Sequence, residues 1–267
     1  MPGTARRTII LLSSKRSGST AVFTMFQRHP DVGVCHVNRA IDLWEPNFWN
    51  FGAEAIAGRP ELFAKRFAES HPFLGGGAPR SEDELFAMWD AILDRQGPTV
   101  FDKSPKYLGD RAAFDLMLKY RARGDDLRFI ALVRDPRDVI TSQFTLWNHL
   151  VEGDSPAFRE DRWIAQYEHL EQLQRQFYIP LFRYEDFAAA PAVYAPIMFE
   201  HCGVRHVPEA YAHVRPVNVG RHATSDKEEI RAWTPGEKLR RMMRVFGYRA
   251  TPAPLVEPKP AVTTAAS

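Results

Sequence analysis

Residues 15–20 of this 267-residue chain read Lys-Arg-Ser-Gly-Ser-Thr, a combination suited to binding phosphate. Gly18 lets the backbone approach a ligand closely, while Lys15 and Arg16 supply positive charge that can hold several oxygens. Further hydrogen-bond donors come from three hydroxyl side chains: Ser17, Ser19 and Thr20. A Walker loop has lysine directly after its last glycine, whereas Ser19 follows Gly18 here, so an ordinary ATP or GTP loop is disfavoured.

A second cation, Arg134, directly follows the apolar run at residues 127–133, and Ser142 lies about two helical turns further on. Arg134 could bind an anion or could form a structural ion pair with Asp138, and both interpretations stay open. Two cationic sites at strand ends of one small sheet suggest a ligand with phosphate groups at separate positions of a nucleoside. Such a ligand is not a triphosphate.

The elements that must position these side chains are strands of a parallel sheet. Four apolar runs predict buried strands: residues 8–13, 100–102, 127–133 and 179–182. Helical spacing follows the first run until Pro30, and a helix capped by Asp135, with Pro136 first and Asp138 at the capping-box position, follows the third. The sequence therefore predicts an α/β fold with a central, mostly parallel sheet flanked by helices and a P-loop-like loop.

The chain is expected to form a single domain over residues 1–250, followed by a disordered tail at 251–267 rich in proline, alanine and threonine. Residues 38–96 show little strand character and predict helices and loops that cover a ligand, with helical patterns at 62–68 and 84–93. Aromatic residues in this region are expected to line a pocket or to pack in the core: Trp44, Phe48 and Trp49.

Composition excludes several classes of protein. Lys and Arg number 35 against 33 Asp and Glu, so bulk charge indicates neither nucleic acid nor a membrane surface as partner. Cys35 and Cys202 cannot build a disulfide framework, and the histidines lack the spacing of metal ligands. The apolar run near the N-terminus is too short to cross a membrane. We therefore expect a cytoplasmic protein without a membrane span or a metal.

Four segments, taken together, resemble the sulfotransferases that use 3′-phosphoadenosine 5′-phosphosulfate (PAPS). Residues 16–20 are similar to the family's 5′-phosphosulfate loop, and residues 133–142, with arginine and serine eight positions apart, to its 3′-phosphate site. Residues 44–49 (Trp-Glu-Pro-Asn-Phe-Trp) and 101–107 (Phe-Asp-Lys-Ser-Pro-Lys-Tyr) are similar to motifs of glycosaminoglycan sulfotransferases. Trp44 replaces the lysine of that pattern, which disfavours a polyanionic sugar acceptor.

Weaker similarity extends beyond these segments. Residues 183–186 (Arg-Tyr-Glu-Asp) resemble a strand end common in the family, and residues 218–221 resemble a late loop whose basic residue, here Arg221, reaches the 3′-phosphate. The resemblance thus implies that the donor's 3′-phosphate is held by Arg134, Ser142 and Arg221. It implies that the 5′-phosphosulfate is held by residues 15–20.

The resemblance also implies the catalytic residues. Glu45 is the expected general base, with His36 as the alternative, since either side chain could take the acceptor's proton at neutral pH. Arg16 and Lys103 are expected to stabilise charge on the leaving phosphate and the sulfate oxygens.

The expected activity is transfer of a sulfuryl group from PAPS to a hydroxyl of a carbohydrate, lipid or other metabolite, releasing 3′-phosphoadenosine 5′-phosphate (PAP). Two alternatives remain: a nucleotide-dependent phosphotransferase with a P-loop-like site, and a non-catalytic nucleotide-binding protein on the same fold. The kinase alternative requires Mg²⁺ and lacks the Walker lysine. The presence of Arg16, Lys103 and Glu45 argues against the non-catalytic alternative.

Overall fold

The computed structural model describes residues 6–35, 45–150 and 152–249. Its centre is one sheet in the order β2-β3-β1-β4-β5, in which every neighbouring pair is parallel. The strands are β1 (Arg7–Ser13), β2 (Gly33–Val34), β3 (Thr99–Lys103), β4 (Asp126–Val133) and β5 (Leu181–Arg183). The predicted α/β fold with a parallel sheet is confirmed.

Strand β1 occupies the middle of the sheet and is buried on both faces. Ile9 and Leu11 belong to one hydrophobic core, and Ile10 and Leu12 belong to the other. A strand covered on both sides gains stability from apolar residues at every position, which explains why residues 8–13 show a continuous apolar run rather than alternation.

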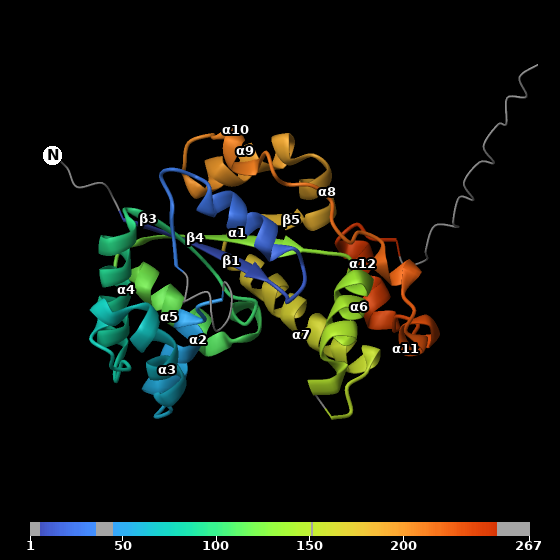
Figure 1. Ribbon diagram of the computed structural model, residues 1–267, viewed down its shortest axis with the longest axis horizontal. Coiled ribbons are helices and arrows are strands. Elements are labelled where there is room, and N and C mark those ends of the chain that lie inside the picture. Colours follow the sequence, from blue (N-terminus) through green and yellow to red (C-terminus); the bar gives the residue numbers. More distant parts are fainter. Residues whose placement is uncertain (1–5, 36–44, 151, 250–267) are drawn as a thin grey trace, which may run out of the picture.

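Helices cover both faces of the sheet (Figure 1). One core is formed with α1 (Ser19–Gln27), α8 (Tyr184–Ala189), α9 (Pro191–Cys202) and α10 (Pro208–Tyr211). The other is formed with α2 (Phe48–Ile56), α3 (Glu61–Ser70), α4 (Glu82–Gln96), α5 (Arg111–Ala122), α6 (Pro136–Trp147), α7 (Pro156–Gln174) and α12 (Glu237–Val245). The short α11 (Glu228–Ala232) lies near α12 in Figure 1.

The predicted elements agree with the structure within a few residues, and the described residues also form elements that were not predicted, among them helices α5, α7, α9 and α12. The two-residue strand β2 was not expected, and it pairs with β3 at the edge of the sheet. Residues 48–96 are largely helical, as expected for the region that follows the first βα unit. The tail at 251–267 lies outside the described residues.

The expectation that the aromatic cluster lines a pocket is wrong for two of its members. Phe48 and Trp49 are fully buried and pack against Trp89, with ring centroids 4.9 and 5.2 Å from it. Their role is therefore core packing, which was the other interpretation of the cluster. Trp44 lies outside the described residues.

The described helices give no evidence of a membrane span, because none of them combines sufficient length with sufficient apolar character.

Asp102 is a buried carboxylic acid next to the sheet's centre. It lies in β3, paired in register with Ile10 of β1, and has no exposed surface. The Tyr107 hydroxyl donates a hydrogen bond of 2.7 Å to its Oδ2. Burial raises the pKa of Asp102 to about 7, although the hydrogen bond from Tyr107 and the charge of Lys103 oppose the rise.

The raised pKa of Asp102 predicts a pH-dependent stability. In the unfolded chain this carboxyl group ionises near pH 4, whereas in the folded protein it holds its proton until about pH 7, so the folded state loses stability as pH rises between these values. The Asp102→Asn variant has no carboxyl group to ionise. The difference between its free energy of unfolding and that of the wild type should therefore change in favour of the variant as pH rises across this interval, and should be constant above it. Urea denaturation at several pH values measures the difference. A difference that stays constant with pH would contradict the buried, protonated state.

Candidate functional site

The loop between β1 and α1 is shaped to receive an anion. Arg16 and Gly18 adopt left-handed backbone conformations, with φ of 70° and 89°, on either side of Ser17. This alternation turns successive backbone N–H groups toward one side of a loop. Helix α1 begins directly afterwards with no side-chain cap and no acidic residue in its first turn. The positive end of its dipole therefore remains available to a bound anion.

Gly18 is required in this loop for two separate reasons. Its positive φ disfavours any residue with a Cβ, and a Cβ built on it would lie 2.1 Å from Cδ2 of Tyr184. Tyr184 in turn lies under the Arg134 guanidinium, whose Cζ is 4.9 Å from the ring centroid. The close approach of the loop to Tyr184 thus connects the first cationic site to the second.

Arg134 lies at the carboxyl end of β4 and is 6% exposed. Its guanidinium donates hydrogen bonds to the backbone carbonyls of Asn218 and Arg16, the latter at 3.3 Å. It also lies 3.5 Å from the Asp138 carboxylate, so the ion pair considered as an alternative does form. The Arg134 Nε is nevertheless buried without a hydrogen-bond partner among the described residues. One donor of this buried side chain is therefore left unsatisfied by the described residues.

The two cationic sites are continuous with one another. The Arg16 Nε donates a 3.0 Å hydrogen bond to the hydroxyl of Ser142, which is itself buried on α6. Burial lowers the pKa of Arg16, and the nearby charges of Arg134 and Arg221 lower it further, while Glu45 raises it. Three guanidinium groups therefore repel one another around this loop, and a bound anion would relieve that repulsion.

The segment containing Arg221 is held by Asp138. The Asp138 carboxylate accepts hydrogen bonds from the backbone N–H of Gly220 at 2.7 Å and from the backbone and ring of His222 at 3.0 and 2.6 Å. Burial raises the pKa of Asp138, but these hydrogen bonds outweigh burial and hold the pKa below its usual range. Asp138 thus stays ionised and fixes Arg221 near Arg134.

The expectation that Asp138 completes a capping box is therefore wrong. Asp135 alone caps α6, through a 2.9 Å hydrogen bond from the Arg137 N–H to its side chain. The Asp138 carboxylate is turned away from the helix terminus because the segment at 218–222 offers it three donors and Arg134 offers it a charge.

Lys103 and Glu45 meet beside the loop, although 58 positions separate them in the sequence. The Lys103 Nζ lies 3.7 Å from Oε1 of Glu45 and 3.5 Å from the hydroxyl of Ser19. The Lys103 side chain is 3% exposed, whereas that of Glu45 is 27% exposed. A buried cation at the phosphate loop and a carboxylate that reaches solvent beside it form the pair that acid–base chemistry requires.

Asn47 holds this pair together, and sequence reasoning gave it no role. Its side-chain amide donates a 3.0 Å hydrogen bond to the Glu45 carbonyl, while its Oδ1 accepts one from the hydroxyl of Ser104. Asn47 is almost fully buried and adopts a left-handed conformation with φ of 54° at the start of α2. It thereby ties the segment carrying Glu45 to the residue after Lys103. The sequence signal that could have pointed to this role is the residue type, because asparagine tolerates a left-handed backbone better than most residues do.

The other expected residues are placed as follows. The Ser17 hydroxyl is buried and donates to the Ser14 carbonyl, so it stabilises the loop from within. Lys15 and Thr20 are exposed on the loop and on the first turn of α1. His36, the alternative base, lies outside the described residues. The contact of Tyr184 with Gly18 and Arg134, and the hydrogen bonds of Asp138 to residues 220 and 222, were not expected, because they join segments distant in the sequence.

A metal is not indicated by the described part of the chain, which contains no group of three or more His, Cys, Asp or Glu side chains arranged to hold an ion.

Comparison with known proteins places this site in a family. A family model described as the sulfotransferase family matches residues 8–209. No curated protein sequence gives a significant match. Among solved structures, the chain is similar to the sulfotransferase domain of the curacin biosynthetic pathway, with a TM-score of 0.64 and 18% identity, over 91% of this chain and 98% of that one.

Two further structures share the fold. The sulfotransferase domain of the olefin synthase from Synechococcus PCC 7002 has a TM-score of 0.62 and 20% identity, over 93% of this chain and 96% of that one. The sulfotransferase STF9 from Mycobacterium avium has a TM-score of 0.57 and 12% identity, over 91% and 76%. Since the family model covers most of the chain and includes the phosphate loop, Lys103, Glu45 and Arg134, the chain belongs to the sulfotransferase family.

Proposed function

We propose that this protein transfers the sulfuryl group of PAPS to a hydroxyl group of a small-molecule acceptor and releases PAP. The observation that carries the proposal is the 3.7 Å contact between Lys103 and Glu45 at the mouth of the phosphate loop. It brings a charge-stabilising cation and a proton acceptor to the place where the loop would hold the end of a nucleotide. The acceptor would be a carbohydrate, a lipid or another hydroxylated metabolite.

The residues at the two cationic sites suit a donor with phosphate groups at both its 5′ and 3′ positions. The N–H groups of residues 18–20 and the Arg16 side chain would hold the 5′-phosphosulfate. Arg134, Ser142 and Arg221 would hold the 3′-phosphate. The unpartnered Nε of Arg134, the uncapped start of α1 and the mutual repulsion of the arginines all support binding of such an anion.

The chemistry assigned to the side chains is limited, because sulfuryl transfer, like phosphoryl transfer, depends mainly on positioning and electrostatics. The acceptor oxygen attacks sulfur, and the bond between sulfur and the bridging phosphate oxygen breaks. Glu45 takes the proton from the attacking hydroxyl. Lys103 and Arg16 stabilise the negative charge that develops on the departing phosphate.

Binding experiments test the donor assignment. PAP should bind more tightly than AMP, which lacks only the 3′-phosphate, and more tightly than ADP with or without Mg²⁺. Arg134→Ala should weaken PAP binding by about 2 to 5 kcal/mol, and Ser142→Ala by about 1 kcal/mol, while AMP binding changes little in either variant. Isothermal titration calorimetry measures all of these affinities.

AMP serves in that experiment as the control for folding, because a collapsed site would lose both nucleotides. Equal affinity of the wild type for PAP and ADP would contradict the proposed donor and favour the phosphotransferase alternative.

Substitution of Glu45 tests the base. Glu45→Gln keeps the shape of the side chain but cannot accept a proton, so turnover should fall by about 10²- to 10⁴-fold while PAP affinity remains that of the wild type. The assay follows label from ³⁵S-PAPS into an acceptor found by screening hydroxylated metabolites. His36→Asn provides the matched comparison. Full activity of Glu45→Gln combined with loss in His36→Asn would move the base to His36.

A further inference from the structure

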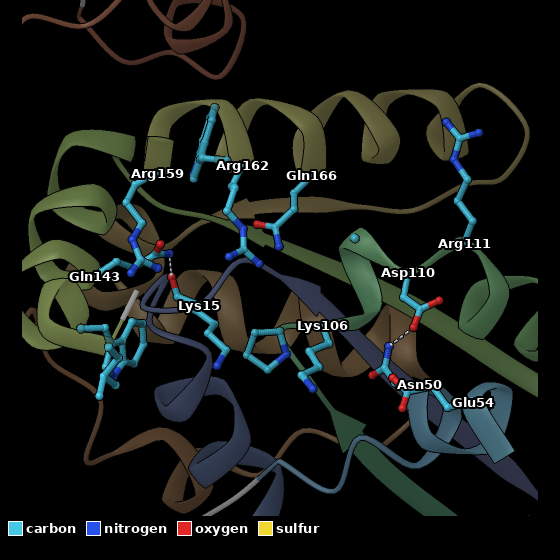
Figure 2. Close-up of a pocket in the computed structure, with 15 residues that line it drawn as sticks. Lys15, Asn50, Glu54, Lys106, Asp110, Arg111, Gln143, Arg159, Arg162 and Gln166 are labelled. Carbon is cyan, nitrogen blue, oxygen red and sulfur yellow. Dashed lines mark hydrogen bonds between the residues drawn. The ribbon is translucent and has the colours of Figure 1, made fainter. Parts of the chain in front are cut away.

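A pocket of about 740 Å³ is lined by residues of α2, α6 and α7, of the loop after β1 and of the segment that follows β3 (Figure 2). Its wall includes Lys15, the residue before Arg16, and Lys106, three positions after Lys103. The wall therefore includes residues close in sequence to Arg16 and to Lys103, the two cations assigned to the sulfate end of the donor. Its volume is typical of a site for a small molecule.

The lining of this pocket is unusually basic. It contains five cationic side chains and only two carboxylates, and the cations are Lys15, Lys106, Arg111, Arg159 and Arg162. Arg159 is neutralised by the buried Asp154, 2.6 Å away. Arg111 donates to Gln172 and lies at one end of the pocket, far from Lys15 in Figure 2. Three cations remain to be explained.

These three, Lys15, Lys106 and Arg162, have no carboxylate within ion-pair distance in the described part of the chain. Each instead lies over an aromatic ring: Lys15 over Trp147 at 5.2 Å, Lys106 over Phe51 at 5.0 Å and Arg162 over Phe158 at 5.8 Å. An aromatic ring holds a cation in place without using its hydrogen-bond donors in the ring plane. All three side chains are exposed, so their donors remain available to a ligand.

The three cations come from separate elements that face the same space. Figure 2 shows Arg162 and Gln166 extending from α7 toward the loops that carry Lys15 and Lys106. The Lys15 backbone is fixed by a 2.8 Å hydrogen bond from the Gln143 amide to its carbonyl. The two acids lie toward the same end of the pocket as Arg111 (Figure 2), where Asp110 caps α5 and accepts a 2.7 Å hydrogen bond from Asn50, with Glu54 nearby.

The donor does not account for this charge. Its 3′-phosphate is assigned to Arg134, Ser142 and Arg221, none of which lines the basic pocket. The sulfate end is assigned to Arg16 and Lys103. Lys15, which the sequence predicts to hold the 5′-phosphosulfate, instead lies over Trp147 in the wall of the basic pocket, and we assign it to that pocket. The donor therefore does not use the cations of the basic pocket, and these cations are available to bind the acceptor.

We propose that the acceptor carries an anionic group, a carboxylate or a phosphate monoester, which Lys106, Arg162 and Lys15 bind while its hydroxyl faces Glu45. This inference rests on the proposed function and adds the chemical class of the acceptor to it. A guanidinium fork on α7 and two ammonium groups on the loops across the pocket suit a compact group with two or three oxygens. The limited number of cations suits one anionic group, which differs from the polyanionic sugar that Trp44 disfavours.

Binding to the PAP complex tests the inference without turnover. With PAP saturating, both phosphate sites of the donor are occupied, and two matched pairs of probes are titrated: glycerol 3-phosphate against glycerol, and lactate against methyl lactate. The charged member of at least one pair should bind at least about tenfold more tightly, as measured by calorimetry and by the fluorescence of Trp147, which lies beneath Lys15. Equal affinity within both pairs would overturn the inference.

Charge variants locate the effect. Lys106→Gln and Arg162→Gln should each weaken binding of the charged probe by at least about tenfold and leave PAP affinity unchanged. Arg175→Gln is the matched control, because Arg175 is exposed on the C-terminal end of the same helix α7 and does not line the pocket. If both pocket variants bind the charged probe as the wild type does, the inference is wrong.

The same variants distinguish failure of this inference from failure of the proposed function. Wild-type protein that binds PAP and sulfates neutral acceptors as efficiently as their charged counterparts would retain the proposed function and lose the anionic acceptor. Wild-type protein that does not bind PAP would lose the proposed function, whatever its affinity for the probes.

Discussion

Electrostatic repulsion among arginine side chains is the constraint around which this site is built. Burial lowers the pKa of Arg16, and the nearby charges of Arg134 and Arg221 lower it further. Like charges do not gather at the edge of a sheet without compensation, and here it comes from two backbone carbonyls, the Tyr184 ring and the ionised Asp138. This compensation is incomplete. A ligand with two phosphate groups would reduce the remaining repulsion among the arginines and thereby stabilise the site.

The parallel sheet provides the geometry that makes this concentration of charge possible. Strand β1 lies between β3 and β4, and all three end at the same edge. Each is followed by a residue or loop that bears cations: the loop at 15–20, Lys103 at the end of β3 and Arg134 after β4. Ligand sites of open α/β sheets form at this edge because the loops there converge. Asn47, the residue before α2, then holds Glu45 at the same place by accepting a hydrogen bond from Ser104 in the segment after β3 and donating one to the Glu45 carbonyl.

Much of this arrangement could be predicted from local sequence. Strands β1 and β4 show long apolar runs, and the segments after them contain the glycine, hydroxyl and arginine residues that bind anions. Both cationic sites could therefore be predicted from the sequence. The strand β2 was not visible, since two residues carry no periodicity and its pairing with β3 is set by the tertiary structure. The meeting of Lys103 with Glu45 followed from resemblance to a family rather than from spacing.

Residues whose roles depend on distant contacts were missed or misread. Asp138 looked like a helix cap because its position relative to Asp135 fits one, yet its partners lie at 220 and 222. Phe48 and Trp49 could not be divided between core and pocket from the sequence, because both environments favour aromatic side chains. The pocket's basic lining was also hidden, since its three cations without carboxylate partners come from three separate segments.

The most direct test of the account is a crystal structure of the protein with PAP. The account predicts the 5′-phosphate against the backbone N–H groups at the start of α1, with Arg16 in contact. It predicts the 3′-phosphate against Arg134 and Ser142, with the Lys103–Glu45 pair open to the other side. A structure with PAP bound in which Arg16 and Arg134 both point away from the two phosphate groups would contradict the account.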